Sequence, residues 1–336
     1  MGNQVKLALL GLGYWGKNLF RTFSAIPHAD IRLGCDLDPK NLDALRKSHP
    51  NCEFTGDFQR AFNDPEIDGV VIATPPATHY ELAKAALTAK KHTFVEKPIT
   101  LDLNHANELV ALSKSVGKTL MVGHLLKHHP ATTYLKNLVD SGDLGEINCI
   151  YTQRVNLGII RSDENPLWSL SPHDISLILY FSGEMPERVS AMGGSFLQKG
   201  IEDVIFAMMK FPSGHIASMH LSWLDPHKVR RLTIVGSKQM AVFDDMENRE
   251  KLRIYDKGAS IKSNPQTLME YMAVRDGDIY IPKIDNREPL RIECENFLDC
   301  VQGKAETKSG GEEAVRILKV ITMLDESLKS QGTGKI

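Results

Sequence analysis

An acid and a base stand side by side in the run FVEKP, residues 94–98, at the end of an apolar, strand-like segment. Buried charges are costly, and neighbouring strand residues point to opposite sides, so Glu96 and Lys97 do not simply neutralise each other. A lysine in this position can hydrogen-bond a hydroxyl group and stabilise the alkoxide that forms from it. A solvated loop lysine is the alternative. Pro98 ends the strand and is a candidate for a cis peptide bond.

A second candidate is His173, which lies in the apolar run LWSLSPHDISLIL, residues 167–179. Ser171 suits a helix N-cap, Pro172 suits the first helical position, and Asp174 completes a pattern similar to a capping box. The run therefore predicts a helix that begins at Ser171. The positive end of the helix dipole would then favour the neutral imidazole that a general base needs. His173 is either a proton acceptor or a packed residue of the helix start.

The run GLGYWG has the spacing G-x-G-x-x-G, formed by Gly11, Gly13 and Gly16 between a strand-like and a helical segment. Such glycines permit a tight turn, close approach of a pyrophosphate, and packing of the helix on the strand. Asp36 follows at about the distance where an acid accepts the ribose hydroxyls of adenosine. The absence of an arginine directly after Asp36 favours NAD over NADP, although Lys40 weakens this preference. A methyl-donor site, a nucleotide-sugar site or a structural turn are the alternatives.

Two further segments follow predicted strands and are expected to contribute to the same site. In ATPPATH, residues 73–79, the two prolines end the strand, and the segment is either a rigid turn or a cofactor contact. His124 follows the strand-like run TLMVG. The residues expected at the cofactor, besides the three glycines and Asp36, are Tyr14, Trp15, Thr74, Pro75, His79, Glu96, Lys97, His124 and Trp168.

The region around His173 contains polar residues that suit a phosphorylated substrate. Arginines bind diphosphates through paired hydrogen bonds. The residues expected to bind substrate are Lys97, Arg154, Asn156, Arg161, Asn165 and His173. His124, His128 and His129 do not have the spacing of a metal site, and no acid or thiol stands close to them in the sequence, so no metal is expected.

The order of strand-like and helical segments indicates an α/β protein with two domains. Residues 4 to about 125 alternate short β-branched runs with helical segments, which predicts a doubly wound parallel sheet of the Rossmann type over residues 1–125. Residues 126–336 contain many strands joined by short polar turns, then two helical segments. They predict an α+β domain with a large open mixed or antiparallel sheet, with the last helix free to return to the first domain.

Composition excludes several classes of function. The net charge is −2 over 336 residues, with no basic stripe, which disfavours binding to nucleic acid or to a membrane surface. No apolar run is long enough for a transmembrane helix, and the N-terminal residues show no signal-peptide pattern. The five cysteines have no Cys-x-x-Cys spacing, which suggests reduced thiols in a cytoplasmic protein.

The motifs GLGYWG, ATPPATH and VEKP, followed by His-Asp at 173–174, resemble those of the glucose-fructose oxidoreductase / inositol dehydrogenase / rhizopine-catabolism (Gfo/Idh/MocA) family over essentially the whole chain. The runs at 123–147, 154–168 and 288–318 resemble its nucleotide-sugar branch, which includes 3-dehydrogenases of UDP-N-acetylglucosamine and of its uronate.

The resemblance implies a specific activity. It implies NAD-dependent oxidation of a ring hydroxyl, C3 of a UDP-linked N-acetylamino sugar, to a 3-keto sugar for later transamination. Lys97 and His173 match the catalytic lysine and histidine of the family. Members usually carry an aspartate at position 169, where this chain has Ser169. A dehydrogenase of a free polyol such as myo-inositol and a non-catalytic NAD- or sugar-binding protein are the alternatives.

The open sheet of the second domain also predicts self-association. A large apolar sheet face is unusual in water, so we expect it to pair with a second copy in a homodimer or homotetramer.

Overall fold

The computed structural model describes residues 4–158, 160–261 and 272–330. Tertiary contacts divide the chain into two compact units, each with its own sheet. The first unit comprises residues 1–128 and 287–319, and the second comprises residues 129–286 and 320–336. Residues 1–3, which carry part of the expectation about a signal peptide, lie outside the described residues.

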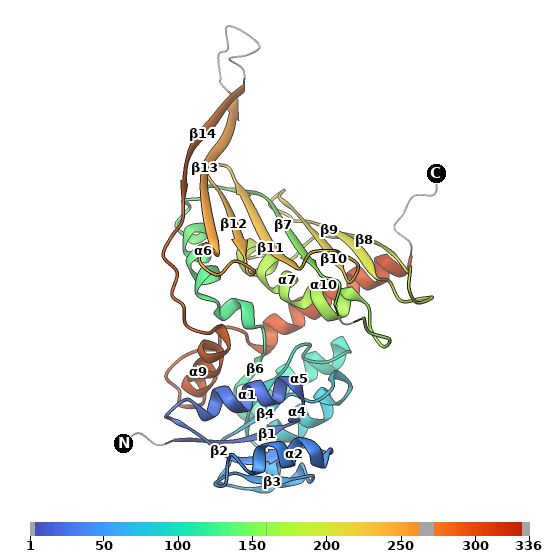
Figure 1. Cartoon of the computed structure of the whole chain (residues 1–336), viewed down its shortest axis with the longest axis vertical. Coiled ribbons are helices and arrows are strands. Elements are labelled where there is room, and N and C mark those ends of the chain that lie inside the picture. Colours follow the sequence, from blue (N-terminus) through green and yellow to red (C-terminus); the bar gives the residue numbers. More distant parts are fainter. Residues whose placement is uncertain (1–3, 159, 262–271, 331–336) are drawn as a thin grey trace. The chain divides into compact units, whose positions relative to one another are not determined.

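The first unit is built on a six-stranded parallel sheet with the order β3-β2-β1-β4-β5-β6. Its strands are β1 (Val5–Leu10), β2 (Ala29–Cys35), β3 (Glu53–Thr55), β4 (Gly69–Ile72), β5 (His92–Val95) and β6 (Leu120–Val122) (Figure 1). The strand order reverses between β1 and β4. Because parallel crossovers are right-handed, this reversal places helices on both faces of the sheet. The predicted doubly wound parallel sheet is therefore confirmed.

Helices of this unit cover an apolar core. They are α1 (Tyr14–Ser24), α2 (Pro39–Arg46), α3 (Gln59–Asn63), α4 (His79–Thr88), α5 (Leu103–Val116), α9 (Pro289–Val301) and the 3-10 turns η1 (Pro76–Thr78) and η2 (Leu125–His128). α9 packs on α1, and its Phe297 is buried with Phe23 and Phe94. The three-residue β3 and the short α3 were not predicted, because segments this short show no hydrophobic period.

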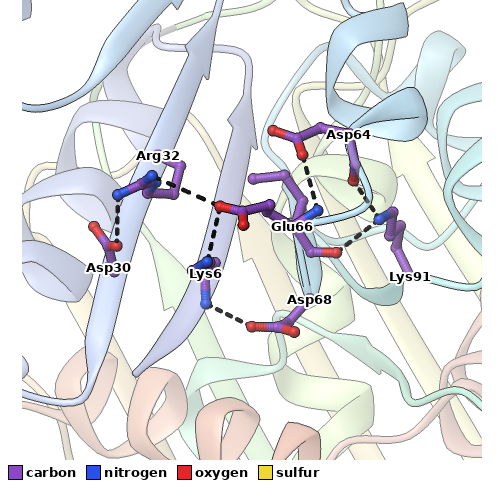
Figure 2. A network of polar contacts seen from close by, with 8 residues as sticks. Lys6, Asp30, Arg32, Asp64, Glu66, Asp68 and Lys91 are labelled. Carbon is purple, nitrogen blue, oxygen red and sulfur yellow. Dashed lines mark hydrogen bonds and ion pairs between the residues drawn. The ribbon is translucent and has the colours of Figure 1, made fainter. Parts of the chain in front are cut away.

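A network of charged residues holds the amino ends of the strands together (Figure 2). Its labelled members are Lys6, Asp30, Arg32, Asp64, Glu66, Asp68 and Lys91. The buried Lys91 Nζ donates to the carbonyl oxygens of Asp64 at 2.6 Å and Ile67 at 2.7 Å. Ligands bind parallel sheets at the carboxyl ends of the strands. The network therefore stabilises the edge that does not carry the site.

The second unit contains an eight-stranded sheet with the order β14-β13-β12-β11-β7-β10-β9-β8, in which only β7 and β10 pair in parallel. The strands are β7 (Ile147–Val155), β8 (Arg188–Gly194), β9 (Val204–Lys210), β10 (Ile216–Ser222), β11 (Val229–Gly236), β12 (Met240–Asp244), β13 (Leu252–Ile261) and β14 (Met272–Tyr280) (Figure 1). The predicted large mixed sheet is confirmed. The short segment 237–239 joins β11 to β12, in keeping with the predicted short turns.

One face of this sheet is covered and the other is exposed. α7 (Pro166–Ser182) packs on β7, β9 and β10, and α6 (Pro130–Asp140) contacts β12. In β9 the buried Ile205 and Ala207 alternate with the exposed Phe206 and Met208. α10 (Gly311–Lys329) is divided between the two units after Lys319. Nowhere in the described ranges is a helix both long and apolar enough to cross a lipid bilayer.

Candidate active site

The glycine turn between β1 and α1 has the geometry of a dinucleotide site. Gly11 has φ +85°, and a Cβ there would lie 2.7 Å from the carbonyl oxygen of Ala73. A Cβ at Gly16 would overlap the carbonyl oxygen of Gly11, whereas a Cβ at Gly13 would meet nothing within 4 Å. Gly13 precedes α1, whose start has no side-chain cap. Open space before uncapped N–H groups fits the pyrophosphate of NAD.

The carboxylate of Asp36 is held in place at the end of β2. Its Oδ2 accepts the N–H of Leu12 at 2.6 Å and Nδ2 of Asn41 at 3.2 Å. Its Oδ1 accepts the N–H of Asp38 at 2.8 Å. Lys17 Nζ donates to Oδ1 of Asn41 at 3.0 Å. A carboxylate oriented in this way can accept the ribose hydroxyls of NAD, because each oxygen has more than one acceptor site. Asn41 and Lys17 were missed by sequence reasoning, since polar residues on a helix carry no distinctive signal.

His79 joins the turns that follow β4 and β5. Its Nδ1 lies 2.7 Å from the carbonyl oxygen of Pro98, and its Nε2 lies 2.9 Å from that of Thr74. The ring is buried, and both of its nitrogens contact backbone carbonyl groups, which fits the rigid turn that the sequence suggested as one of two interpretations. The Lys97–Pro98 peptide bond is cis, as predicted. The hydroxyl oxygen of Thr74 accepts a hydrogen bond from the hydroxyl group of Thr78 at 2.7 Å. Pro75, between β4 and η1, is exposed.

At the end of β5, Glu96 is buried and Lys97 is half-buried. The N–H of Lys97 donates to Glu96 Oε2 at 3.2 Å. A Cβ at Gly123 would lie 3.1 Å from the same oxygen, so the glycine makes room for the carboxyl group. Burial raises the pKa of Glu96 to about 7, although the charge of Lys97 acts in the opposite direction. An acid that titrates near neutrality therefore stands next to the candidate catalytic lysine.

Glu293 of α9 was not foreseen from the sequence. It is 1% exposed, and its Oε1 lies 3.9 Å from Nε2 of His128. Burial, and then the charge of Glu96, raise its pKa well above the usual value. A signal was present: Leu290, Cys294 and Phe297 form the apolar stripe of α9, and Glu293 lies within that stripe by helical spacing.

Two histidines are buried near these carboxyl groups. Burial, the largest cause, lowers the pKa values of His124 and His128 to about 3, so both rings are neutral at physiological pH. His128 Nε2 lies 3.2 Å from Oγ of Ser309. The sequence suggested His124 as a cofactor contact, and the structure places its ring in the interior of the first unit. The described part of the chain contains no group of three or more His, Cys, Asp or Glu residues that would hold a metal ion.

In the second unit, the predicted start of the helix at Ser171 is wrong. α7 begins at Pro166, and Asn165 caps it by accepting the N–H groups of Leu167 at 3.1 Å and Trp168 at 3.3 Å. Asn165-Pro166 provides the same cap signal six residues earlier. Pro172 is thus an interior proline, and Ser171 donates to the carbonyl oxygen of Leu167.

His173 does not stand at the start of a helix. The residue lies well inside α7, so the positive end of the helix does not explain a neutral imidazole there. His173 is half-buried on a helix whose neighbouring residues are mostly buried. Ser169 precedes it by four residues and is also half-buried, so the two share one face of the helix.

The other residues expected to bind substrate have protein partners. Arg154 donates Nε and Nη2 to the buried carboxylate of Asp174, both at 3.0 Å. Asp174 therefore belongs to a buried ion pair and not to a capping box. Arg161 is exposed and pairs with Glu164 at 3.1 Å. Asn165 donates to Glu202 at 2.8 Å in addition to capping α7.

Trp168 and Asn156 are anchored within the second unit. Trp168 is half-buried, and its Nε1 donates to Asp325 at 3.2 Å. The N–H of Asn156 donates to the carbonyl oxygen of Ser222 at 3.1 Å.

In the first unit, Tyr14 is 85% exposed and meets Trp15 edge-on. The first unit thus gathers the glycine turn, Asp36, Glu96 and Lys97 on one sheet edge. The second unit carries His173 and its neighbours on and before α7.

Comparison with protein-family models gives two matches. Residues 5–124 match an oxidoreductase family with an NAD-binding Rossmann fold. Residues 132–242 match the C-terminal domain of the same GFO/IDH/MocA family.

The chain is similar to two enzymes of named activity. It is 29% identical over 254 residues to UDP-N-acetylglucosamine 3-dehydrogenase of Acidithiobacillus ferrooxidans, covering 75% of this chain and 76% of that protein. It is 27% identical over 270 residues to 2,7-anhydro-N-acetylneuraminate hydratase of Escherichia coli, covering 74% and 70%.

Solved structures share the fold. The structure of the Acidithiobacillus ferrooxidans dehydrogenase superposes with a TM-score of 0.83 at 23% identity, covering 98% of this chain and 99% of that one. The structure of scyllo-inositol dehydrogenase from Lactobacillus casei, with bound NAD(H) and scyllo-inositol, superposes with a TM-score of 0.80 at 21% identity, covering 98% of both chains.

Proposed function

The chain belongs to the Gfo/Idh/MocA family of NAD-binding oxidoreductases, and we propose that it oxidises the C3 hydroxyl of a UDP-linked 2-acetamido sugar. The product would be a 3-keto nucleotide sugar, a substrate for transamination. One observation carries the proposal: Lys97 lies at the same carboxyl edge of the parallel sheet as the glycine turn and Asp36. The similarity to UDP-N-acetylglucosamine 3-dehydrogenase over three-quarters of the chain supports the choice of sugar.

The residues of the first unit hold the cofactor and polarise the alcohol. The N–H groups at the start of α1 bind the pyrophosphate, and Asp36 accepts the adenosine ribose hydroxyls. When bound, NAD supplies the acceptor for the hydride of the alcohol carbon. Lys97 donates a hydrogen bond to the substrate oxygen and stabilises the negative charge that develops on it.

The residues of the second unit take the proton and bind the sugar nucleotide. We propose that His173 accepts the hydroxyl proton as a general base. Ser169 stands where the family usually has a carboxylate, so His173 acts without that acid. Arg161 is suited to the diphosphate, since its guanidinium is exposed, and Asn156 and Trp168 are suited to the sugar. Arg154 acts through its ion pair with Asp174, which holds β7 against α7.

We further propose that the protein acts in the cytoplasm as a homodimer or homotetramer. Free cysteines suit a reducing compartment. The exposed face of β8, β9 and β10 carries Met192 (64% exposed), Phe206 (56%) and Met208 (54%). Because neighbouring strands bring these side chains together, they form an apolar patch of the kind that marks an association surface.

The activity is tested by following nicotinamide absorbance with NAD and a panel of candidate substrates. The panel contains UDP-N-acetylglucosamine, its uronate and myo-inositol. It also contains 2,7-anhydro-N-acetylneuraminate, because the chain is similar to a hydratase of that compound. We expect reduction of NAD with at least one of the two UDP-sugars. His173→Ala and Lys97→Ala should each lower turnover about 10²–10⁴-fold, while NAD binding survives.

Matched control substitutions separate catalysis from folding. His105 on α5 and Lys47 after α2 are exposed residues outside the proposed site, so His105→Ala and Lys47→Ala should retain turnover. Reduction of NAD with inositol alone would replace the proposal by a polyol dehydrogenase. Cofactor binding without turnover of any substrate would indicate a binding protein. Near-normal turnover by His173→Ala or Lys97→Ala would remove that residue from the mechanism.

A further inference from the structure

Two carboxyl groups are buried in the first unit and influence each other electrostatically, and the proposed mechanism uses neither. Glu96 follows β5 and is 8% exposed, and Glu293 comes from α9 and is 1% exposed. The charge of Glu96 acts on the pKa of Glu293, so the two groups are within electrostatic reach. Two buried carboxylates cannot both be charged without a large cost. The pair therefore holds at least one proton near neutral pH.

The surroundings indicate which group keeps the proton. The positive charge of Lys97 acts on Glu96 and favours the ionised form of its carboxyl group. Oε1 of Glu293 lies 3.9 Å from Nε2 of His128, whose ring is neutral, and the next residue of the helix, Cys294, has a thiol that burial keeps neutral. Oε1 of Glu293 has no hydrogen-bond donor among the described residues. Glu293 therefore remains protonated, and Glu96 is the member of the pair that exchanges a proton near pH 7.

The position of Glu96 exposes it to the charge of the cofactor. It lies at the carboxyl end of β5, on the opposite side of β1 from Asp36. A dinucleotide that lies across the strand ends with its adenosine ribose at Asp36 directs its other half toward β4 and β5. The nicotinamide ring is positively charged in NAD and neutral in NADH. Glu96 thus experiences a positive charge in one redox state and not in the other.

We propose that Glu96 is a redox-linked proton site, ionised when the oxidised cofactor is bound and partly protonated at neutral pH when the reduced cofactor is bound. The inference rests on the proposed function for the placement of the nicotinamide. Oxidation of an alcohol by NAD breaks one C–H and one O–H bond, transfers a hydride to the cofactor and yields one proton. As the ring loses its charge, Glu96 regains the fraction of a proton that it gave up when NAD bound. The chemical step therefore releases less than one proton to the medium, because the remainder was already released when NAD bound.

The direction of the expected pH effect follows from linkage. A positive ring lowers the pKa of a nearby carboxyl group, so binding of NAD at about pH 7 releases protons from Glu96. Because the unliganded Glu96 has a pKa of about 7, roughly half a proton is expected per NAD bound at that pH. Release falls above pH 8 or so, where Glu96 is already ionised. Binding of NADH should release almost none.

Proton release is measured by isothermal titration calorimetry of the full chain in two buffers of different ionisation enthalpy. Wild type should release protons with NAD and not with NADH. Glu96→Gln should release none with either cofactor. Glu293→Gln should behave as wild type, because an amide and a protonated carboxyl group are both neutral. Glu295→Gln is the matched control on the outer side of α9 and should also behave as wild type.

Infrared difference spectroscopy of the wild type gives a second readout that needs no variant. The carbonyl stretch of a protonated carboxyl group should lose intensity when NAD binds and keep it when NADH binds. Equal proton release with both cofactors, or release that persists in Glu96→Gln, would overturn the inference. Failure of either cofactor to bind would overturn the proposed function as well, so the two failures are distinguishable.

Discussion

Among single residues, Asp36 has the clearest effect on the choice of cofactor. Its carboxylate is fixed by Leu12, Asp38 and Asn41, so it presents a negative charge in one orientation. We expect Asp36→Asn to lower kcat/KM for NAD about 10–100-fold, because hydrogen bonds to a charged group contribute about 1.5–3 kcal/mol. The same change removes repulsion of the 2′-phosphate, so the ratio of NADP to NAD efficiency should rise.

Steady-state kinetics with both cofactors would check this prediction. Asn41→Ala is the informative companion variant, since it removes one hydrogen bond to Asp36 and the partner of Lys17 but keeps the carboxylate. It should raise KM for NAD by less than Asp36→Asn and leave kcat unchanged. An unchanged NADP to NAD ratio in Asp36→Asn would contradict the assignment of Asp36.

At the residue level, local patterns predicted the parts of the site that depend on local geometry. The glycine turn, Asp36, the Glu-Lys pair and the cis-proline all follow from spacing at strand ends. Glu293 depends on the packing of α9 on η2, a segment far from it in the sequence, and no local pattern reports that packing. It was visible only as a charge inside an apolar helical stripe.

At the level of elements, competition between equivalent signals explains the error in α7. Both Asn165-Pro166 and Ser171-Pro172 satisfy the pattern of an N-cap followed by proline. The longer helix forms because Leu167 and Phe181 are buried along with the residues between them that face the sheet. Their burial outweighs the hydrogen bond that Pro172 removes. Tertiary packing therefore selected the start of the helix.

The network at the amino ends of the strands permits a test of stability without loss of activity. Lys91→Met removes both hydrogen bonds from Nζ to the carbonyl oxygens of Asp64 and Ile67. The carbonyl oxygen of Asp64 keeps the N–H of Ile67 as a donor, but the buried carbonyl oxygen of Ile67 loses its partner. Leaving a buried acceptor unpaired costs about 1–3 kcal/mol, so the free energy of unfolding in urea should fall by that order. Turnover should be unchanged, because Lys91 is at the opposite edge of the sheet from Lys97.

Lys114→Met is the matched control. Lys114 is exposed and pairs with Glu312, and surface ion pairs contribute only about 0–1 kcal/mol. Its free energy of unfolding should therefore change little. Equal destabilisation of the two variants would show that the buried hydrogen bonds of Lys91 have no special role.

For the whole molecule, periodicity separated a βα-alternating half from a strand-rich half, and the fold class is confirmed on that basis. Segments that join a unit from a distance were harder to predict. Residues 287–319 return to the first unit because Cys294, Phe297 and Leu298 complete its core. Their helical period was evident, but an amphipathic helix packs equally well on any apolar surface of matching shape.

The proposed self-association is a prediction about the whole molecule, and the exposed sheet face allows a direct test. Phe206 stacks on His220 of the neighbouring strand, with ring centroids 4.3 Å apart, and Met208 lies on the same face. Met208→Lys places a charge within this apolar patch, which costs little in a monomer but is unfavourable when buried in an interface. Light scattering should show a dimer or tetramer for wild type and a smaller species for Met208→Lys. Met246→Lys changes an exposed methionine beyond the end of β12 and should leave the assembly intact. A monomeric wild type, or an assembly insensitive to Met208→Lys, would show that this face does not mediate association.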